Sequence, residues 1–163
     1  MAKVFIGLGS NLLDPVKQLT KAIFSLSQLS GTLVLNISQF YGSTPLGPSD
    51  QPDFVNAVCL IETTFTPLEL LRALKSIEME QGRVKKRHWG ERLIDLDILL
   101  FDDLELASAV LTIPHRDMIF RDFVLIPLLE IAPDLIIPNK GSVKSLVLEL
   151  QTSYLYPLSD VSQ

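Results

Sequence analysis

Two aspartates, Asp95 and Asp97, stand two positions apart in the otherwise apolar run 93–101. A strand alternates its side chains between two faces, so we expect both carboxylates on one face, with stems roughly 6–7 Å apart. Neighbouring carboxylates repel each other, and a hard divalent cation relieves that repulsion because it prefers oxygen ligands. The pair therefore predicts a metal site of the phosphoryl-transfer type, in which two ions lie about 3.5–4 Å apart. The alternative is a sheet face that carries two aspartates by chance, although aspartate is depleted in strands. The intervening apolar side chains are expected to point the other way, into a core: Ile94, Leu96, Ile98 and Leu100.

A basic segment, residues 83–92, comes directly before this strand and holds five Lys or Arg and one acid in a chain of net charge −5. A compact basic island in an acidic protein favours a small polyanion, such as a nucleotide phosphate chain, over nucleic acid or an anionic membrane. Arg83 and Arg92 are candidates to stabilise negative charge on a transferring phosphate. A solvated run of charges is the alternative for the residues between them, Lys85, Lys86 and Arg87.

Three further groups of residues suggest a flat ligand. Trp89 lies in a polar, glycine-containing loop with nothing local to pack against, which favours a lid that closes over a bound ring. Phe54 and Asn56 share one strand face, where a ring could stack and an amide could read its edge; a core phenylalanine beside an edge asparagine is equally compatible with the sequence. Polar residues at 114–117 and 121–123 form a second candidate patch.

The remaining pattern predicts the elements that must position these groups. Gly7-Leu8-Gly9 is interpreted as a tight turn after a strand at 3–8, and a capping box at 66–69 begins the second helix. Asp14 is expected to cap the first helix, with Pro15 at its first position. The expected elements are strands at 3–8, 32–40, 54–63 and 93–101, helices at 15–29 and 67–81, and, towards the C-terminus, helices at 125–131 and 142–150 with a strand at 135–137.

This order predicts an α+β fold: a ferredoxin-like βαββαβ core with an antiparallel sheet, helices on one face, and a C-terminal extension. The other face would then be left for a ligand. With 163 residues, we expect a single domain over 1–163 and a loose tail at 154–163. The single cysteine, Cys59, is interpreted as a small core residue, and neither a signal peptide nor a membrane span is expected, which favours the cytoplasm.

These motifs resemble those of the hydroxymethyl-dihydropterin pyrophosphokinases of folate synthesis. The resemblance covers nearly the whole chain, and its most specific segment is His88-Trp89-Gly90-Glu91-Arg92-Leu93-Ile94-Asp95-Leu96-Asp97-Ile98. Further matches are Pro45-Leu46-Gly47-Pro48, Gln51-Pro52-Asp53-Phe54-Val55-Asn56, Gln81-Gly82-Arg83 and Thr112-Ile113-Pro114-His115. The family transfers pyrophosphate from ATP to the hydroxymethyl group of a reduced pterin and releases AMP.

The resemblance also implies roles for single residues. Asp95 and Asp97 would hold two Mg²⁺ ions with ATP, and Arg83 and Arg92 would act on the phosphates. The pterin would stack between Phe54 and Phe123, with its edge read by Asn56, Ser43, Pro45 and Leu46. The nucleotide would contact Glu78, Lys85, Trp89, Ile98, Thr112, His115, Arg116 and Arg121. The implied partners are ATP and the reduced pterin, without nucleic acid or membrane, and the chain is expected to be a monomer.

The chain departs from the family pattern at Lys85 and His88, where arginine is common, and at Glu91, where proline is common. Lysine cannot supply the two-pronged contact of arginine, so contacts between the lid and ATP are expected to differ. Three alternatives stay open: a nucleotide-binding regulatory module without catalysis, a metal-dependent phosphohydrolase, and, more distantly, a small RNA-binding domain.

Overall fold

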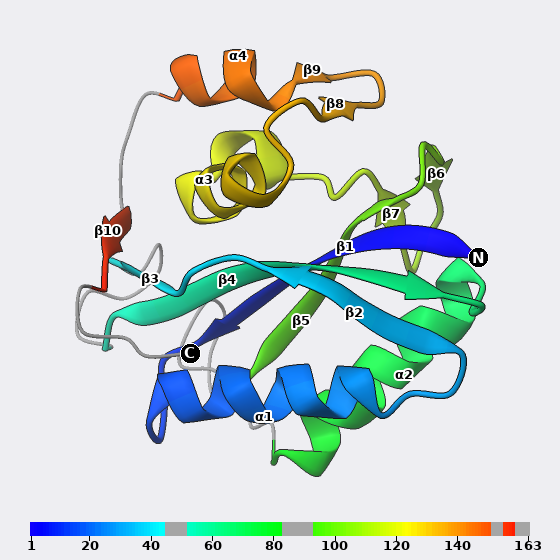
Figure 1. Ribbon diagram of the computed structural model, residues 1–163, viewed down its shortest axis with the longest axis vertical. Coiled ribbons are helices and arrows are strands. Elements are labelled where there is room, and N and C mark those ends of the chain that lie inside the picture. The colour runs from blue at the N-terminus through cyan, green and yellow to red at the C-terminus, as the bar shows by residue number, and fades with distance from the viewer. Residues whose placement is uncertain (45–51, 83–92, 151–154, 159–163) are drawn as a thin grey trace.

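A central antiparallel sheet organises the computed structural model, which describes residues 1–44, 52–82, 93–150 and 155–158 (Figure 1). Within these residues the sheet has six strands, of which five follow the order β10-β3-β4-β1-β5, while β2 pairs with the far part of β4. The strands are β1 (Ala2–Ser10), β2 (Thr32–Ile37), β3 (Tyr41–Ser43), β4 (Phe54–Thr63), β5 (Asp95–Phe101) and β10 (Leu155–Pro157). This arrangement confirms the predicted α+β, ferredoxin-like core.

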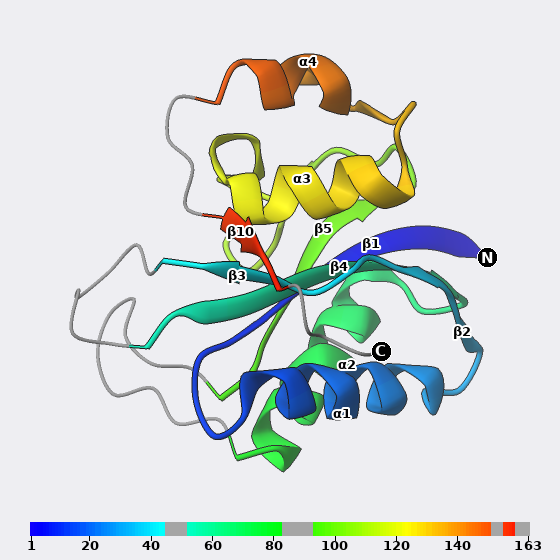
Figure 2. The ribbon, with the colours of Figure 1, turned by 60° about the vertical axis from the view of Figure 1, so that its left-hand side comes forward.

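Two long helices, α1 (Pro15–Ser27) and α2 (Pro67–Glu80), cover one face of the sheet (Figures 1 and 2). Their apolar stripes bury the first core cluster against β1, β4 and β5, with side chains such as Leu19 and Leu74 fully buried. The capping box of α2 forms as predicted, since Thr66 and Glu69 each accept a backbone N–H of the other. Asp14 stands at the N-cap of α1 and Pro15 at its first position, as predicted, but Asp14 adopts φ 61° and its side chain makes no capping bond.

The C-terminal extension covers part of the opposite face, so that the sheet lies between two helical layers (Figure 2). Helix α3 (Asp122–Ile131) packs directly against β4, and α4 (Val143–Leu148) packs on α3. The second core cluster fills the space beneath them, where Leu125 and Leu128 meet Phe5, Val58 and Leu100. The smaller elements of the extension are β6 (Leu106–Ala107), β7 (Thr112–Ile113), the 3₁₀ turn η1 (Met118–Phe120), β8 (Ile136–Ile137) and β9 (Gly141–Ser142).

Three sequence predictions need correction. Gly7-Leu8-Gly9 is not a turn, because β1 continues through it to Ser10 and stays paired with β4 and β5. The strand expected at 32–40 ends at Ile37 as β2, and a separate strand that was not predicted, β3, follows at Tyr41–Ser43; the two pair with opposite ends of β4. The predicted loose tail at 154–163 is wrong for Leu155–Pro157, since these residues form β10 on the edge of β3.

A change of register in β5 alters which way its side chains point. Phe5 pairs with Leu100 but Ile6 pairs with Ile98, so Leu99 is an extra residue opposite β1. Such a bulge interrupts the alternation of a strand. Leu96 and Ile98 therefore pack in the first core cluster as predicted, whereas Leu100 packs in the second. In the described ranges no helix is long and apolar enough to cross a membrane.

Candidate active site

One face of the sheet changes from apolar to polar along the direction of its strands. At one end Phe5 pairs with Leu60 and Leu100, beneath α3 and α4. Two residues further along β1, Gly7 has one polar partner, Asp97, and one apolar partner, Val58. Directly paired residues of antiparallel strands point to the same face. Two rows of paired residues therefore run across β5, β1 and β4. The first row is Asp97, Gly7 and Val58, and the second is Asp95, Gly9 and Asn56.

Gly7 and Gly9 give the centre of this polar region a floor without side chains. Gly7 lies opposite Asp97 and Gly9 lies opposite Asp95. A Cβ atom at Gly9 would come within 3.0 Å of the Asn56 Nδ2 atom and 3.9 Å of the Phe54 ring. Glycine inside a strand weakens the sheet and often marks a place where a ligand approaches the backbone closely. Gly9 therefore leaves bare backbone between Asp95 and the amide of Asn56, whereas the Leu99 side chain lies above Gly7, 3.3 Å from the place of a Cβ atom.

The two aspartates share the face that the sequence predicted. Leu96, between them, is buried in the first core cluster, while Asp97 is exposed and Asp95 is half-buried. The Leu96 N–H donates to the Glu78 carboxylate of α2 over 2.8 Å. Glu78 is itself only 5% exposed. It thus anchors β5, the last strand in the described part of the sheet, at the residue that separates the two aspartates.

On the other side of the glycine floor, Asn56 is fixed by a neighbour. The Ser43 hydroxyl donates to Asn56 Oδ1 over 2.5 Å, and both side chains are buried. This bond leaves the amide N–H groups of Asn56 on the side of Gly9. Phe54 is half-buried on the same face. The arrangement can hold a flat ring against Phe54 and donate hydrogen bonds to an acceptor on its edge.

His115 approaches Asp97 because of the bulge in β5. The Leu99 carbonyl, at the bulge, accepts the His115 N–H over 2.9 Å. His115 Nδ1 accepts the Asp117 N–H over 3.2 Å, so the neutral ring carries its proton on Nε2 and can donate it to a ligand. Burial lowers the pKa of His115 and outweighs the opposing effect of the Asp97 carboxylate.

Arg121, at the N-cap of α3, and Phe123, in its first turn, bring a cation and a ring to the same polar end. Arg121 forms an ion pair with Asp117 over 3.4 Å, and its guanidinium lies 5.6 Å from the centre of the Phe123 ring. Phe123 is half-buried at the edge of the second core cluster. Because α3 packs on β4, its start can supply the second wall of a slot whose first wall is Phe54.

Other predicted residues lie elsewhere. Ile98 is 3% exposed and belongs to the first core cluster, so its side chain faces away from Asp97 and only its main chain remains for a nucleotide. Thr112 is half-buried in β7, and Arg116 is exposed beside His115. Six predicted residues fall outside the described ranges: Pro45, Leu46, Arg83, Lys85, Trp89 and Arg92.

The carboxylate pair fits a hard cation by the chemistry of its donors, since both supply oxygen and one is exposed. No group of three or more His, Cys, Asp or Glu side chains comes together as a metal site in the part of the chain that the structure describes. Two carboxylates alone would leave several coordination positions for water and phosphate oxygens, as is usual for magnesium bound with a nucleotide.

Comparison with known families accounts for this arrangement. The family model described as 7,8-dihydro-6-hydroxymethylpterin-pyrophosphokinase (HPPK) matches residues 5–133. The chain belongs to the HPPK family. The matched segment includes both aspartates, the glycine floor and the start of α3.

Two curated pyrophosphokinases resemble the chain over most of their length. A 2-amino-4-hydroxy-6-hydroxymethyldihydropteridine pyrophosphokinase of Haemophilus influenzae is 54% identical over 90% of this chain and 92% of its own. A protein of the same description from Pseudomonas aeruginosa is 47% identical over 84% of this chain and 85% of its own. A relative in Schizosaccharomyces pombe, folic acid synthesis protein fol1, is 46% identical, but the chain spans only 18% of it.

Solved structures support the HPPK fold. The wild-type Plasmodium falciparum HPPK-DHPS with pteroate superposes with a TM-score of 0.73 at 15% identity. That match covers 91% of this chain and 42% of the other. The HPPK-DHPS structure with SDX-DHP gives a TM-score of 0.70 at 17% identity, over 91% and 43%. The chain thus spans less than half of these longer proteins, and at such identities the likeness concerns the fold.

The sequence did not predict the place of Gly7 and Gly9 in the candidate site, because a lone Gly-x-Gly was interpreted as a turn. The signal was present in their spacing: residues two apart in a strand share a face, so two such glycines clear that face. Asp53 and Tyr156 were also missed, since their contact involves a strand that the sequence did not indicate.

Proposed function

We propose that this protein transfers pyrophosphate from ATP to the hydroxymethyl group of 6-hydroxymethyl-7,8-dihydropterin, giving AMP and the pterin diphosphate for tetrahydrofolate synthesis. The observation that carries the proposal is the row Asp95–Gly9–Asn56 within a chain of the HPPK family. It places anionic ligands for a metal on one side of a bare backbone and a ring-and-amide surface on the other. This is the arrangement that a metal-bound triphosphate and a pterin would need to meet.

The pterin half of the site is assigned to Phe54, Asn56, Ser43 and Phe123. In this proposal the ring stacks between the two phenylalanines, and Asn56 reads its edge because Ser43 fixes the amide. Pro45 and Leu46 complete the group by resemblance alone. The bare backbone at Gly9 lets the pterin lie flat and direct its hydroxymethyl group toward β5.

The nucleotide half is assigned to the residues around β5. Asp95 and Asp97 would hold two magnesium ions, which supply charge neutralisation and orientation for the triphosphate when bound. His115 and Arg121 contact phosphate or nucleotide from the start of the extension. Glu78, Ile98, Thr112 and Arg116 border the nucleotide, and Arg83, Lys85, Trp89 and Arg92 are added by the resemblance.

The reaction follows from positioning. The hydroxymethyl oxygen attacks the β-phosphorus in line, an O–P bond forms, and the bond from that phosphorus to the bridging oxygen of the α-phosphate breaks. AMP leaves with the bridging oxygen, and the hydroxyl proton passes to water. No covalent enzyme intermediate is required, so the chain's task is to orient two substrates and offset charge.

Product analysis with the purified protein tests the proposal. Incubated with ATP, magnesium and the pterin, the protein should form AMP and diphosphorylated pterin in equal amounts. Phosphate released from ATP alone would indicate a hydrolase, and nucleotide binding without product would indicate a regulatory module; either result would overturn the assignment. Omitting magnesium should stop turnover.

We further propose that the protein acts as a monomer, which light scattering tests, and that it acts in the cytoplasm.

A further inference from the structure

The short strand β10 lies beyond the segment that the HPPK family model matches, which ends at residue 133. It pairs with β3 in antiparallel register, with Leu155 opposite Ser43 and Tyr156 opposite Gly42. Both views place β10 beside β3 and close to the start of α3 (Figures 1 and 2). A segment from the very end of the chain therefore lies along the edge of the proposed pterin site.

This strand contacts all three elements that supply the proposed pterin residues. On β3, Leu155 pairs with Ser43 itself. At α3, the Leu155 N–H donates to Asp122 Oδ2 over 2.8 Å, and Asp122 immediately precedes Phe123. Before β4, the Tyr156 hydroxyl donates to Asp53 Oδ2 over 2.7 Å, and Asp53 immediately precedes Phe54.

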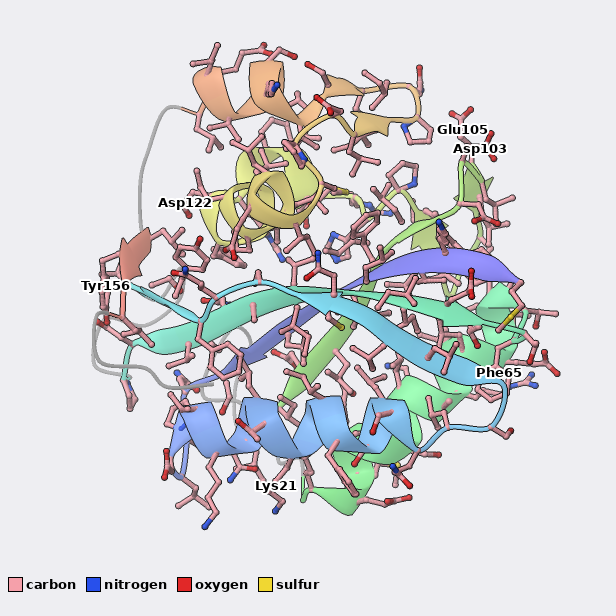
Figure 3. All side chains as sticks on the ribbon, in the orientation of Figure 1. Lys21, Phe65, Asp103, Glu105, Asp122 and Tyr156 are labelled. Carbon is pink, nitrogen blue, oxygen red and sulfur yellow. The ribbon has the colours of Figure 1, made fainter. Side chains whose placement is uncertain are left out.

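The bond from Leu155 to Asp122 is partly buried, whereas the bond from Tyr156 to Asp53 is exposed. Asp122 is only 2% exposed, so its bond to β10 is shielded from water. Figure 3 shows Asp122 and Tyr156 at the same end of the molecule. The bond to Asp53, together with burial, raises the pKa of Tyr156 to about 12, so the hydroxyl keeps its proton and remains a donor at neutral pH.

Gly42 makes the approach of Tyr156 possible. A Cβ atom at Gly42 would overlap the Tyr156 ring, so the ring lies directly across the glycine backbone. Gly42 pairs with Val55, and both Val55 and Leu158 pack against the first core cluster, so Tyr156 and Leu158 lie on the α1 and α2 side of the sheet. The Leu155 N–H bonds to Asp122 of α3 on the opposite side, so β10 is anchored on both faces.

We propose that β10 is a clamp for the pterin slot and that Tyr156 is its positioning residue. The clamp fixes Ser43, Phe54 and Phe123 relative to one another through Leu155, Asp53 and Asp122. It acts on the pterin half alone, because the carboxylates of β5 lie beyond β4 and β1 in the sheet. This inference rests on the proposed function and assigns the C-terminal strand a part in it.

Replacement of the tyrosine hydroxyl tests the clamp. Tyr156→Phe keeps the ring over Gly42 but removes the bond to Asp53, so the KM for the pterin should rise roughly 3- to 10-fold, the range expected for the loss of one ordinary hydrogen bond in an exposed position. The KM for ATP should stay unchanged. Equal changes in both constants, or none, would overturn the proposal.

A matched variant separates positioning from general loosening. Thr32→Val removes the buried 2.8 Å bond between the Thr32 and Thr63 hydroxyls at the far end of β4. It should lower the melting temperature at least as much as Tyr156→Phe without raising the KM for the pterin. If Thr32→Val produced the same rise, the effect of Tyr156→Phe would be one of stability, and the clamp would be rejected.

A second pair of variants probes the ring contact. Gly42→Ala should displace the ring and raise the KM for the pterin, and it should add little once Tyr156→Ala has removed that ring. If the two substitutions raised the KM for the pterin independently and additively, the contact between the Tyr156 ring and Gly42 would have no part in pterin binding. Hydrogen exchange at residues 41–43, which Tyr156→Phe should accelerate, requires no turnover. If the wild-type protein made no pterin diphosphate, the proposed function would fail, while unchanged exchange would be evidence against the clamp alone.

Discussion

The carboxylate of Glu78 accepts the backbone N–H of Leu96 over 2.8 Å, at the residue that separates Asp95 from Asp97. An exposed strand edge leaves backbone N–H groups without strand partners, and here a buried side chain from α2 takes that place. The helix on one face of the sheet therefore fixes the position of groups on the other.

Replacement of Glu78 should loosen this connection. Glu78→Ala leaves the Leu96 N–H without its acceptor in a buried position, which should cost about 1–3 kcal/mol in the free energy of unfolding. Glu78→Gln retains an acceptor oxygen and should recover part of the loss. Urea unfolding of both variants measures the difference. If both unfolded like the wild type, Glu78 would have no structural part, and a nucleotide contact would be its remaining role.

Loss of Asp97 should remove activity without removing the fold. Asp97 is exposed, so its replacement by alanine should change stability by no more than about 0.5 kcal/mol. Turnover should fall roughly 100-fold or more, as for other groups that stabilise transition-state charge. AMP formation and thermal unfolding measure the two effects. Asp103→Ala is a suitable control, since Asp103 is an exposed aspartate in the turn after β5 (Figure 3). Near-normal turnover of Asp97→Ala would contradict the metal site.

Filling the glycine floor should impair pterin binding. The Cβ of Gly9→Ala would lie 3.0 Å from Asn56 Nδ2, and Ser43 holds that amide in place. We expect the KM for the pterin to rise about fivefold, which corresponds to one hydrogen bond of about 1 kcal/mol. Gly7→Ala makes the same change on the same strand, but its Cβ would meet Leu99 at 3.3 Å instead. Gly7→Ala should therefore raise the KM for the pterin less than Gly9→Ala does. A larger rise for Gly7→Ala would show that the pterin does not lie over Gly9.

The single cysteine should be unreactive in the folded protein. Cys59 is 0% exposed in the middle of β4, and burial raises the pKa of its thiol to about 12, from an ordinary value of 9.0. Only the thiolate reacts with disulfide reagents, so labelling at pH 8 should follow global unfolding. The raised pKa also means that the unfolded chain loses this proton first, so stability should fall as pH rises from about 9 toward 12. Rapid labelling without denaturant would contradict the burial of Cys59.

Local signals predicted much of this fold. The capping box of α2 involves residues three apart, and it forms as expected. The β4 strand has the predicted bounds, because its apolar and β-branched composition suits a buried central strand. Asp95 and Asp97 share a face because alternation is a property of the strand itself.

Features that depend on pairing could not be read from the sequence. The bulge at Leu99 exists only in relation to β1, and it sends Leu100 to the second core cluster. β10 owes its place to a partner more than a hundred residues away. Asp14 occupies the expected N-cap position, but the left-handed backbone at Leu13 and Asp14 differs from the extended conformation of an ordinary N-cap, and its side chain makes no capping bond.

Helix α3 both covers the second core cluster and carries Phe123 in its first turn. Leu125 and Leu128 lie on its underside and pack in that cluster. Under the proposed function, the stability of the fold and the recognition of the pterin therefore depend on the same stretch of ten residues. A substitution that repacks Leu125 or Leu128 to suit a hotter or colder habitat also shifts Phe123. Changes in thermal stability and changes in pterin binding are therefore expected to evolve together.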